Sequence, residues 1–384
     1  KRCRSTRVVD SRSARCPRFC SDASRRSGRS VTGGSLRLGT RRSALALAQS
    51  GHVADAITAA TGIPVELVPI VSEGDVTRAP LAQLGGTGVF ATRLREALAA
   101  GECDLLVHSL KDLPTAPAPG LRIAAMPRRA DPRDVSVTRG TLLAEIGEGV
   151  IGTGSPRRQA QLHRRAPRAR VAELRGNVDS RLARVRDGEL DGVVLAAAGL
   201  ARLGLVDGAD RAKGAAHEDG AEAVWGTGSA DGLLLEPLGL AEWPTAAGQG
   251  AFAIEVREDA SPDLLAAIAP LEDSATRFAV TIEREILAGI EAGCHAPVGV
   301  HASVTEEDVR VRAVVYALNG GRRVGLDHAE SLAKGYIRRT GGGNGANAAD
   351  SADPTVRAAL IGSAIARRLL EDGAADLVSR EFST

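Results

Sequence analysis

Six arginines lie at turns where a predicted strand leads into a predicted helix, or one helical turn beyond. In chain order they are Arg41, Arg42, Arg157, Arg158, Arg175 and Arg181. A helix N-terminus attracts anions through its free N–H groups and its dipole, and a guanidinium adds paired donors that match a carboxylate or phosphate. One such arginine pair usually belongs to a solvated surface, but three groups at equivalent turns favour an anionic ligand.

Lys111 and Asp112 follow a predicted buried strand over residues 104–108. They would therefore lie at the carboxyl edge of a sheet, where α/β proteins bind their ligands. There Asp112 could act as an acid, as a base or as the stabiliser of a cation. A strand-ending turn with an ordinary salt bridge explains this segment equally well, so the segment alone does not decide between the two.

Cys294 follows a long predicted helix and lies between Gly293 and His295. Gly293 can take the left-handed conformation that ends a helix, which would expose the cysteine on a tight loop. A cysteine beside a histidine can be a nucleophile, although a lone cysteine is more often structural. Three of the other cysteines lie in the first 35 residues, and the spacings indicate neither a disulfide framework nor a metal site. We therefore expect a reducing compartment.

The composition is that of a globular protein. The 384 residues are enough for two or three domains, with 43% hydrophobic and 25% charged residues. Because aromatic residues make up only 2%, the core must consist of Leu, Val, Ile and Ala. The sequence contains no apolar run as long as a membrane span, no GxxxxGK[ST] loop and no HExxH motif.

Residues 1–35 form a basic tail with ten Lys or Arg residues and two acidic residues, a net charge of +8. The whole chain carries +2, so subtracting the tail leaves −6 on the remainder. The tail is rich in serine and lacks a long apolar segment, which is typical of an organelle transit peptide. The alternatives are a disordered basic tail or a translated upstream stretch. A nucleic-acid-binding tail is disfavoured because aromatic residues for base stacking are nearly absent from it.

After the tail, predicted strands and helices alternate, which predicts an α/β fold with mostly parallel sheets and crossover helices. Strands are predicted over residues 36–39, 65–71, 104–108, 121–126, 150–153, 171–174, 192–195, 252–256, 309–317 and 322–326. Helices are predicted over residues 44–60 (capped by Ser43), 92–100, 155–165, 177–187, 197–203, 275–292 and 354–370. The α/β pattern runs twice, so we expect two lobes with a ligand cleft between them and a hinge at residues 131–134.

The division that we expect has four parts. These are the tail over 1–35, a first domain over 36–130 with 245–268, a second domain over 131–244, and a small α+β third domain over 270–384. Residues 206–242 are rich in Gly, Ala and Asp and predict an inserted surface loop.

Nine segments of the sequence resemble, in the same order, those of the porphobilinogen deaminase family. They lie at residues 38–49, 85–90, 107–114, 131–134, 152–159, 174–178, 195–205, 248–251 and 293–299. Two examples are Val107-His-Ser-Leu-Lys-Asp-Leu-Pro114 and Gly293-Cys-His-Ala-Pro-Val-Gly299. No single segment is decisive, but their number and order over most of residues 36–380 identify the chain as similar to that family.

The resemblance implies three domains, the first two resembling periplasmic binding proteins. Cys294 would hold a dipyrromethane cofactor through a thioether. Asp112 would bind pyrrole N–H groups and stabilise the cationic azafulvene that porphobilinogen forms when it loses ammonia. Four porphobilinogen molecules would add head to tail, and water would then release the linear tetrapyrrole, hydroxymethylbilane.

The resemblance also implies which residues hold the anionic groups. The cofactor would be held by Cys294, Lys111, Asp112, Ser155, Arg157 and Arg158. The acetate and propionate groups of the substrate would be held by Arg41, Ser43, Arg175 and Arg181, with Arg202 and Gln249 as further candidates. Paired arginines suit this chemistry because every pyrrole carries two carboxylates and a growing chain requires many fixed cations.

The sequence departs from the family pattern at four positions. Thr87 and Gln83 stand in place of lysines, His295 in place of the glutamine after the anchor cysteine, and Gly154 in place of a serine. The loss of two lysines puts the cofactor-side carboxylate contacts in question. Asp112 and Cys294 remain, and we therefore expect activity.

Two other functions fit part of the pattern. A two-lobed receptor for a small anion explains the lobes and the arginines but leaves Cys294 and Asp112 without a task. A cysteine-dependent hydrolase or transferase would use Cys294 and His295, but adjacent side chains usually point apart and no third orienting group is evident.

For the deaminase, we expect a monomer that takes porphobilinogen as substrate, without a metal and without nucleic-acid or membrane partners. We expect it in the plastid stroma, where it would serve heme and chlorophyll biosynthesis, with the mitochondrion or the cytoplasm as alternatives.

Overall fold

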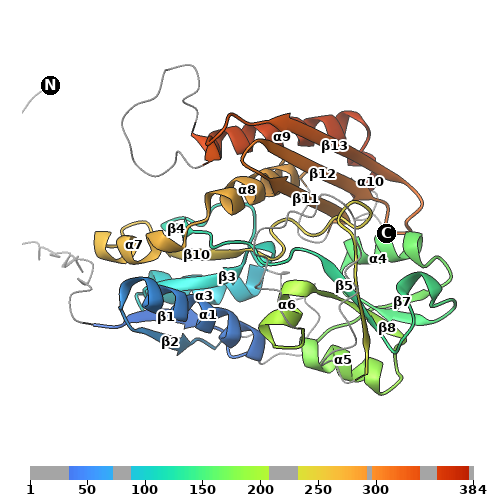
Figure 1. The fold of residues 1–384 in the computed structure, drawn as a ribbon, viewed down its shortest axis with the longest axis horizontal. Helices are drawn as coiled ribbons and strands as arrows, with labels where there is room; N and C mark the ends of the chain where they lie inside the picture. Colours follow the sequence, from blue (N-terminus) through green and yellow to red (C-terminus); the bar gives the residue numbers. More distant parts are fainter. Residues whose placement is uncertain (1–33, 72–87, 207–231, 292–295, 338–352, 380–384) are drawn as a thin grey trace, which may run out of the picture.

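The computed structural model describes residues 34–71, 88–206, 232–291, 296–337 and 353–379. These residues build two five-stranded sheets and one three-stranded sheet. In Figure 1 the two larger sheets lie in two lobes side by side, and the smaller sheet lies above them with its helices. The predicted fold class, two α/β lobes rich in parallel strands with a small α+β region, is confirmed.

The first lobe is built on a sheet with the strand order β2-β1-β3-β10-β4. Its strands are β1 (Leu36–Thr40), β2 (Val65–Pro69), β3 (Leu105–Ser109), β4 (Leu121–Ala125) and β10 (Phe252–Arg257). β1 is parallel to β2 and β3, whereas β10 runs antiparallel between β3 and β4. The helices of this lobe are α1 (Ala44–Thr61), α3 (Gly88–Ala99) and α7 (Pro262–Ile268), with short 3₁₀ turns at η1 (Leu110–Asp112) and η3 (Ala269–Leu271).

The second lobe repeats this arrangement with the strand order β7-β6-β8-β5-β9. Its strands are β5 (Asp134–Thr138), β6 (Val150–Gly152), β7 (Arg170–Ala172), β8 (Gly192–Ala196) and β9 (Leu234–Pro237). Here β5 is the antiparallel strand, between β8 and β9. The helices are α4 (Pro156–Arg165), α5 (Val178–Arg186) and α6 (Ala197–Arg202), with a 3₁₀ turn at η2 (Leu143–Glu145).

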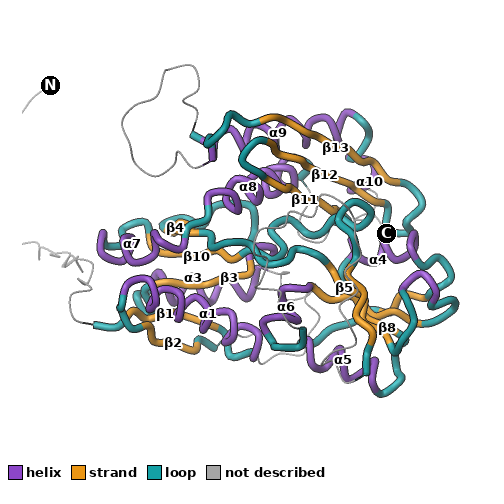
Figure 2. Tube along the Cα trace, in the orientation of Figure 1, coloured by secondary structure: helices purple, strands orange, loops and turns teal. Residues whose placement is uncertain are grey.

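Two loops connect the lobes, and Figure 2 draws both as loop between strands. The first crossover is residues 126–133, between β4 and β5, and the second crossover is residues 238–251, between β9 and β10. As a result, the antiparallel strand of each sheet is the first strand that the chain forms after it has crossed from the other lobe. Any site between the lobes therefore lies beside these two crossovers.

The third region is an antiparallel sheet with the order β11-β12-β13, covered by helices. Its elements are α8 (Ser274–Gly289), β11 (Val298–Val304), β12 (Asp308–Tyr316), β13 (Arg323–Ser331), α9 (Pro354–Glu371) and α10 (Ala375–Ser379). The long helices α8 and α9 lie against one another above the lobes (Figure 1). Phe278 on α8 lies in the core that the helices form with this sheet. Among the described residues, no helix is long and apolar enough to span a bilayer.

The predicted helix starts hold because short polar side chains cap them. The Ser43 hydroxyl accepts a hydrogen bond from the Ala46 N–H at the start of α1, and Ser155 accepts one from the Arg158 N–H at the start of α4. At the other end of α1, Gly62 takes the left-handed conformation with φ 73°. Aliphatic residues fill the cores, as the scarcity of aromatic residues required.

Three strands and two helices escaped the sequence-based prediction: β5, β9, β11, α7 and α10. The prediction of an inserted surface loop over 206–242 is wrong at its end, because Leu233 and Leu235 at β9 are 3% and 1% exposed. Residues 207–231 lie outside the described residues. A four-residue strand between Gly232 and Gly239 is too short to show a period, so burial rather than pattern reveals it.

Glu283 on α8 joins both crossovers to the third region. Its carboxylate accepts hydrogen bonds from Arg129 in the first crossover (2.7 and 3.1 Å) and from the Gly248 N–H in the second crossover (2.7 Å). It also accepts the Ala302 N–H of β11 (2.8 Å). Burial alone would raise the pKa of Glu283, but the Arg129 guanidinium overrides this and holds it at about 2. A side chain with 0% exposure thus fixes three segments at once.

We expect Glu283→Gln to lower the free energy of unfolding at pH 7 by roughly 3–5 kcal/mol, because Arg129 would stay buried without its carboxylate. The folded-state pKa of Glu283 lies below the ordinary value of 4.5, so its stabilisation is present above about pH 4.5 and is lost as the pH falls towards 2. Urea denaturation at pH 7 and pH 3.5 measures both effects. Glu285→Gln on the same helix is the control, and equal losses in both variants would contradict the prediction.

Candidate functional site

Asp134, the first residue of β5, lies at the centre of a buried polar cluster. Its carboxylate accepts hydrogen bonds from Arg157 (2.9 Å) and Arg158 (2.6 Å) on α4. It also accepts them from Trp243 Nε1 (2.9 Å) and Gln249 Nε2 (2.8 Å), both in the second crossover. We call these five residues the Asp134 cluster. Burial would raise the pKa of Asp134, but the two guanidiniums hold it far below its usual range.

Arg157 and Arg158 are the paired arginines that the sequence indicated as carboxylate-binding residues. They are only 3% and 7% exposed, and their nitrogens donate to groups of the protein itself, except for Arg157 Nε, which has no hydrogen-bond partner. Arg158 also donates to the Val194 carbonyl (2.7 Å), and Arg157 to Gln161 Oε1 (2.7 Å). Since two guanidiniums share one carboxylate, the cluster keeps a surplus of one positive charge beneath the surface.

Lys111 brings the first lobe to this cluster. Its Nζ donates to Gln249 Oε1 (3.3 Å), while the amide nitrogen of the same glutamine donates to Asp134. Desolvation, with a smaller contribution from the charges of Arg158 and Arg157, lowers the pKa of Lys111 to about 8, although Asp112 acts in the opposite direction. Asp112 ends the 3₁₀ turn η1 with its side chain exposed. The predicted pair at the carboxyl end of β3 thus lies next to the positive cluster.

The two arginines of the next turn differ in their surroundings. Arg181 on α5 is partly buried, and desolvation together with the charge of Arg158 lowers its pKa, which places it within electrostatic reach of the Asp134 cluster. Its Nε donates to the Gly176 carbonyl (2.9 Å). Arg175 is exposed and pairs with Glu173 (2.8 Å). Of these two predicted residues, Arg181 is the one whose pKa is lowered by burial and by the charge of Arg158 in the cluster.

Arg202 links the two lobes. Its Nη2 donates to the Gly250 carbonyl in the second crossover (3.0 Å), and its guanidinium carbon lies 3.9 Å from the centre of the Phe252 ring on β10. Gly250 has φ 88°, and a Cβ there would lie 2.6 Å from the Ala130 carbonyl of the first crossover. The glycine therefore allows the two crossovers to approach closely, and Arg202 holds the second of them.

The remaining predicted side chains lie at the starts of helices. Ser43 and Ser155 accept helix N–H groups at the starts of α1 and α4, and their hydroxyl hydrogens stay able to donate. Arg41 precedes Ser43 in the turn after β1 and is partly buried. Cys294 and His295, with Gln83 and Thr87, lie outside the described residues. Glu291, the last described residue before that segment, has a φ of 52°.

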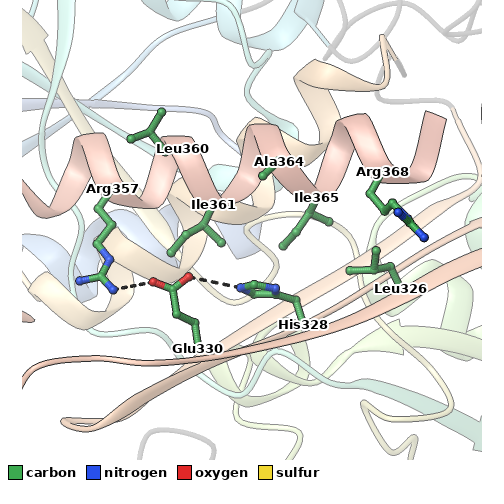
Figure 3. A pocket seen from close by; sticks show the side chains of 9 residues that line it. All are labelled: Leu326, His328, Glu330, Arg357, Leu360, Ile361, Ala364, Ile365 and Arg368. Atoms are coloured by element: carbon green, nitrogen blue, oxygen red, sulfur yellow. Dashed lines mark hydrogen bonds and ion pairs between the residues drawn. The ribbon is translucent and has the colours of Figure 1, made fainter. Parts of the chain in front are cut away.

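A groove lies in the third region, away from these residues. It is formed between β13 and α9 (Figure 3) and is lined by Leu326, His328, Glu330, Arg357, Leu360, Ile361, Ala364, Ile365 and Arg368. Glu330 pairs there with Arg357 on one side and with His328 on the other (3.4 Å). Its lining includes none of the predicted site residues. The described residues also contain no group of three or more His, Cys, Asp or Glu side chains arranged to hold a metal ion.

Sequence reasoning missed Asp134, Trp243 and Glu283. Asp134 had a signal, since it ends the Asp-Pro-Arg-Asp segment, but that segment was interpreted as a hinge. Residues 131–133 do lie in the first crossover, whereas Asp134 begins a central strand with a fully buried side chain. An acidic residue after a proline predicts a turn, and only its pairing with α4 explains its burial.

Comparison with known proteins gives two family matches. The family model of the porphobilinogen deaminase dipyrromethane cofactor-binding domain matches residues 36–263, and that of the porphobilinogen deaminase C-terminal domain matches residues 277–333. The porphobilinogen deaminase of Leifsonia xyli is 45% identical over 349 residues, which are 90% of this chain and 94% of that one. Porphobilinogen deaminase 1 of Streptomyces avermitilis is 49% identical over 307 residues, 76% of this chain and 87% of its own.

Among solved structures, an arginine-specific periplasmic binding protein of Salmonella typhimurium matches with a TM-score of 0.35 and 12% sequence identity. The match covers 63% of this chain and 93% of that one. A likeness with a TM-score this low carries no argument about this chain.

We expect Lys111 of the cofactor-free Cys294→Ala protein to react with an amine-selective acylating reagent with a pH dependence whose midpoint lies near 8, because burial makes its amine neutral at a lower pH than usual. Peptide mapping by mass spectrometry at a series of pH values measures this rate. Lys334, exposed in the third region, is acylated in the same samples and controls for reagent decay. A Lys111 rate that still rose steeply between pH 9 and 10 would contradict the prediction.

Proposed function

The chain belongs to the porphobilinogen deaminase family, and from this premise we propose which of its residues carry the reaction. The protein is a transferase that condenses four porphobilinogen molecules head to tail on a covalent dipyrromethane, with release of ammonia and then of hydroxymethylbilane. This activity belongs to porphyrin and heme biosynthesis. The observation that carries it is the match of the cofactor-binding family model to 36–263, together with relatives that are 45% and 49% identical to this chain over the matched residues.

The charges of the described residues fit the cofactor. Each pyrrole ring brings two carboxylates, and the Asp134 cluster holds a surplus positive charge beside Lys111 and Arg181. When it is bound, the dipyrromethane supplies the pyrrole to which the first substrate is joined. An anion that approaches Lys111 would raise the pKa of its ammonium again, so binding and protonation of this lysine favour one another.

We assign the reacting cation to Asp112. Loss of ammonia leaves a positive charge on the substrate, and an exposed carboxylate at the end of η1 can stabilise this charge while it accepts a pyrrole N–H. Because Asp112 lies beside Lys111, which contacts Gln249, the carboxylate is next to the groups that attract the acidic side chains of the rings. In this proposal the carboxylate that stabilises the substrate cation therefore lies next to the cations that attract the acidic side chains of the rings.

Arg157 and Arg158 act, in this proposal, as a buried source of positive potential. Asp134 occupies Nε and Nη2 of Arg158 and Nη2 of Arg157, so the two arginines attract carboxylates through the surplus charge of the cluster. Arg181 and Lys111 are the cations nearer to the ligand. Gln249 holds Lys111 in place.

The other predicted contacts remain proposals of the same kind. Arg41, Ser43 and Ser155 would meet ligand carboxylates at the starts of α1 and α4. Arg175 would exchange its pairing with Glu173 for a substrate carboxylate. Arg202 would act indirectly, through its hold on the second crossover. Cys294 would be the covalent anchor.

We keep the division into a tail, two lobes and a third domain at the boundaries predicted from the sequence. We also propose a monomer without nucleic-acid or membrane partners. Light scattering on the purified protein tests the oligomeric state.

The named relatives are bacterial, so they give no support to a plastid location, a transit peptide or a role in chlorophyll synthesis, while the cytoplasmic alternative is compatible with them. Residues 1–33 of the basic tail lie outside the described residues.

The intact mass of the purified protein tests the anchor. We expect an added mass equal to two linked pyrroles on the wild-type chain and none on Cys294→Ala, because the thioether requires that sulfur. An unmodified wild-type chain that also failed to gain the adduct from porphobilinogen would overturn the assignment and favour a two-lobed anion-binding protein. Cys103→Ala is the matched control and should keep the adduct.

Replacement of the Asp112 carboxylate tests its role. We expect Asp112→Asn to lower kcat about 100- to 1,000-fold, because the neutral amide no longer stabilises the substrate cation. Asp112→Glu should retain more activity, since the charge is kept. The initial rate of hydroxymethylbilane formation measures both, with Asp259→Asn on the surface as control. A kcat within threefold of wild type in Asp112→Asn would refute the assignment.

A further inference from the structure

Arg284 on α8 holds the backbone directly after Asp112. Its Nη1 donates to the Leu113 carbonyl (3.1 Å) and its Nη2 to the Pro114 carbonyl (2.6 Å). Both contacts join residues about 170 positions apart in the chain, and they connect the third region with the first lobe. A planar guanidinium with two donors on successive carbonyls fixes both the position and the orientation of that backbone.

The turn that carries Asp112 has few restraints of its own. η1 spans only Leu110–Asp112, and its internal hydrogen bond runs from the Leu113 N–H to the Leu110 carbonyl (3.1 Å). The Leu110 N–H is held by the Ala251 carbonyl of the second crossover (3.0 Å). Single 3₁₀ turns have weaker hydrogen-bond geometry than α-helices, so contacts from outside decide how such a turn sits.

Glu283, the residue before Arg284 on α8, holds the segment of the second crossover that packs beside this turn. Glu283 accepts the Gly248 N–H (2.7 Å), and the next residue, Gln249, contacts Lys111. Gly248 lies so close to the turn that a Cβ on it would be 2.9 Å from Leu110. Two consecutive residues of one helix therefore hold the two segments that carry Lys111, Asp112 and Gln249.

We propose that Arg284 is a positioning residue for the reaction, which sets the place of the Asp112 carboxylate by holding the carbonyls of Leu113 and Pro114. This inference rests on the role proposed for Asp112. Both of these contacts are to main-chain oxygens that directly follow Asp112, and neither is to a proposed ligand-binding group. Loss of Arg284 should therefore lower turnover more than the affinity for porphobilinogen. A displacement of about 1 Å in a reacting group can cost on the order of 100-fold in rate.

The test is a comparison of Arg284→Gln, Arg284→Lys and Arg277→Gln. Arg277 lies on the same helix but pairs with Glu272, so it is the matched control for loss of an α8 arginine. We expect kcat of Arg284→Gln to fall about 30-fold with KM within threefold. Arg284→Lys should recover part of kcat because one donor can still reach a carbonyl. Arg277→Gln should keep kcat, and Tm of each variant is measured beside the rates.

A double-mutant cycle with Asp112→Asn separates the two proposals. If Arg284 works through Asp112, Arg284→Gln should cost little further rate in the Asp112→Asn background. Additive losses, or a kcat of Arg284→Gln within twofold of wild type, would overturn the positioning role while leaving that of Asp112 intact. Full activity of Asp112→Asn would instead overturn both. Chemical rescue gives a further test: if added ethylguanidinium restores kcat of Arg284→Gly without changing its Tm, the result supports the proposal. If all arginine variants lose the same amount of Tm and Arg284→Lys recovers no activity, the result overturns it.

Discussion

The site depends on the burial of one carboxylate between two guanidiniums. Removing Asp134 from water costs several kcal/mol unless its oxygens are fully occupied, and Arg157, Arg158, Trp243 and Gln249 occupy them. These partners come from α4 and from the second crossover, so the requirement brings both segments to the start of β5. The same glutamine then reaches Lys111 in the other lobe. The contacts that satisfy the buried Asp134 charge thus also place the cations that would attract an anionic ligand.

A second buried carboxylate, that of Glu283, must also be fully hydrogen-bonded, and it lies on the α8 side of the crossovers. Glu283 draws Arg129, the Gly248 N–H and the Ala302 N–H to α8, which joins the third region to both connections between the lobes. Asp134 and Glu283 approach the second crossover at neighbouring positions, Gln249 and Gly248. A rotation of one lobe against the other would therefore have to leave this short stretch nearly unchanged.

Local features of the sequence predicted most of the elements but few of the partners. Ser43 and Ser155 marked helix starts, and Lys111 with Asp112 marked the end of β3, because capping and sheet edges depend on neighbouring residues. Arg157 and Arg158 were recognised as cations at a turn, but their partner Asp134 lies beyond a proline in a segment typical of a hinge. Contacts such as Arg284 with Leu113, 171 residues apart, follow from the packing of three regions and leave no local pattern.

The return of the chain to the first lobe at β10 has a consequence for the order in which the two sheets are completed during synthesis. All five strands of the second lobe lie within residues 134–237, so that sheet is available as soon as this stretch has emerged. The first lobe must wait for β10, whose Ala253 pairs with His108, although its other four strands are synthesised first. Its edge at β3 stays without a neighbour until then, and early-made chain therefore remains vulnerable longest to pairing with the wrong partner.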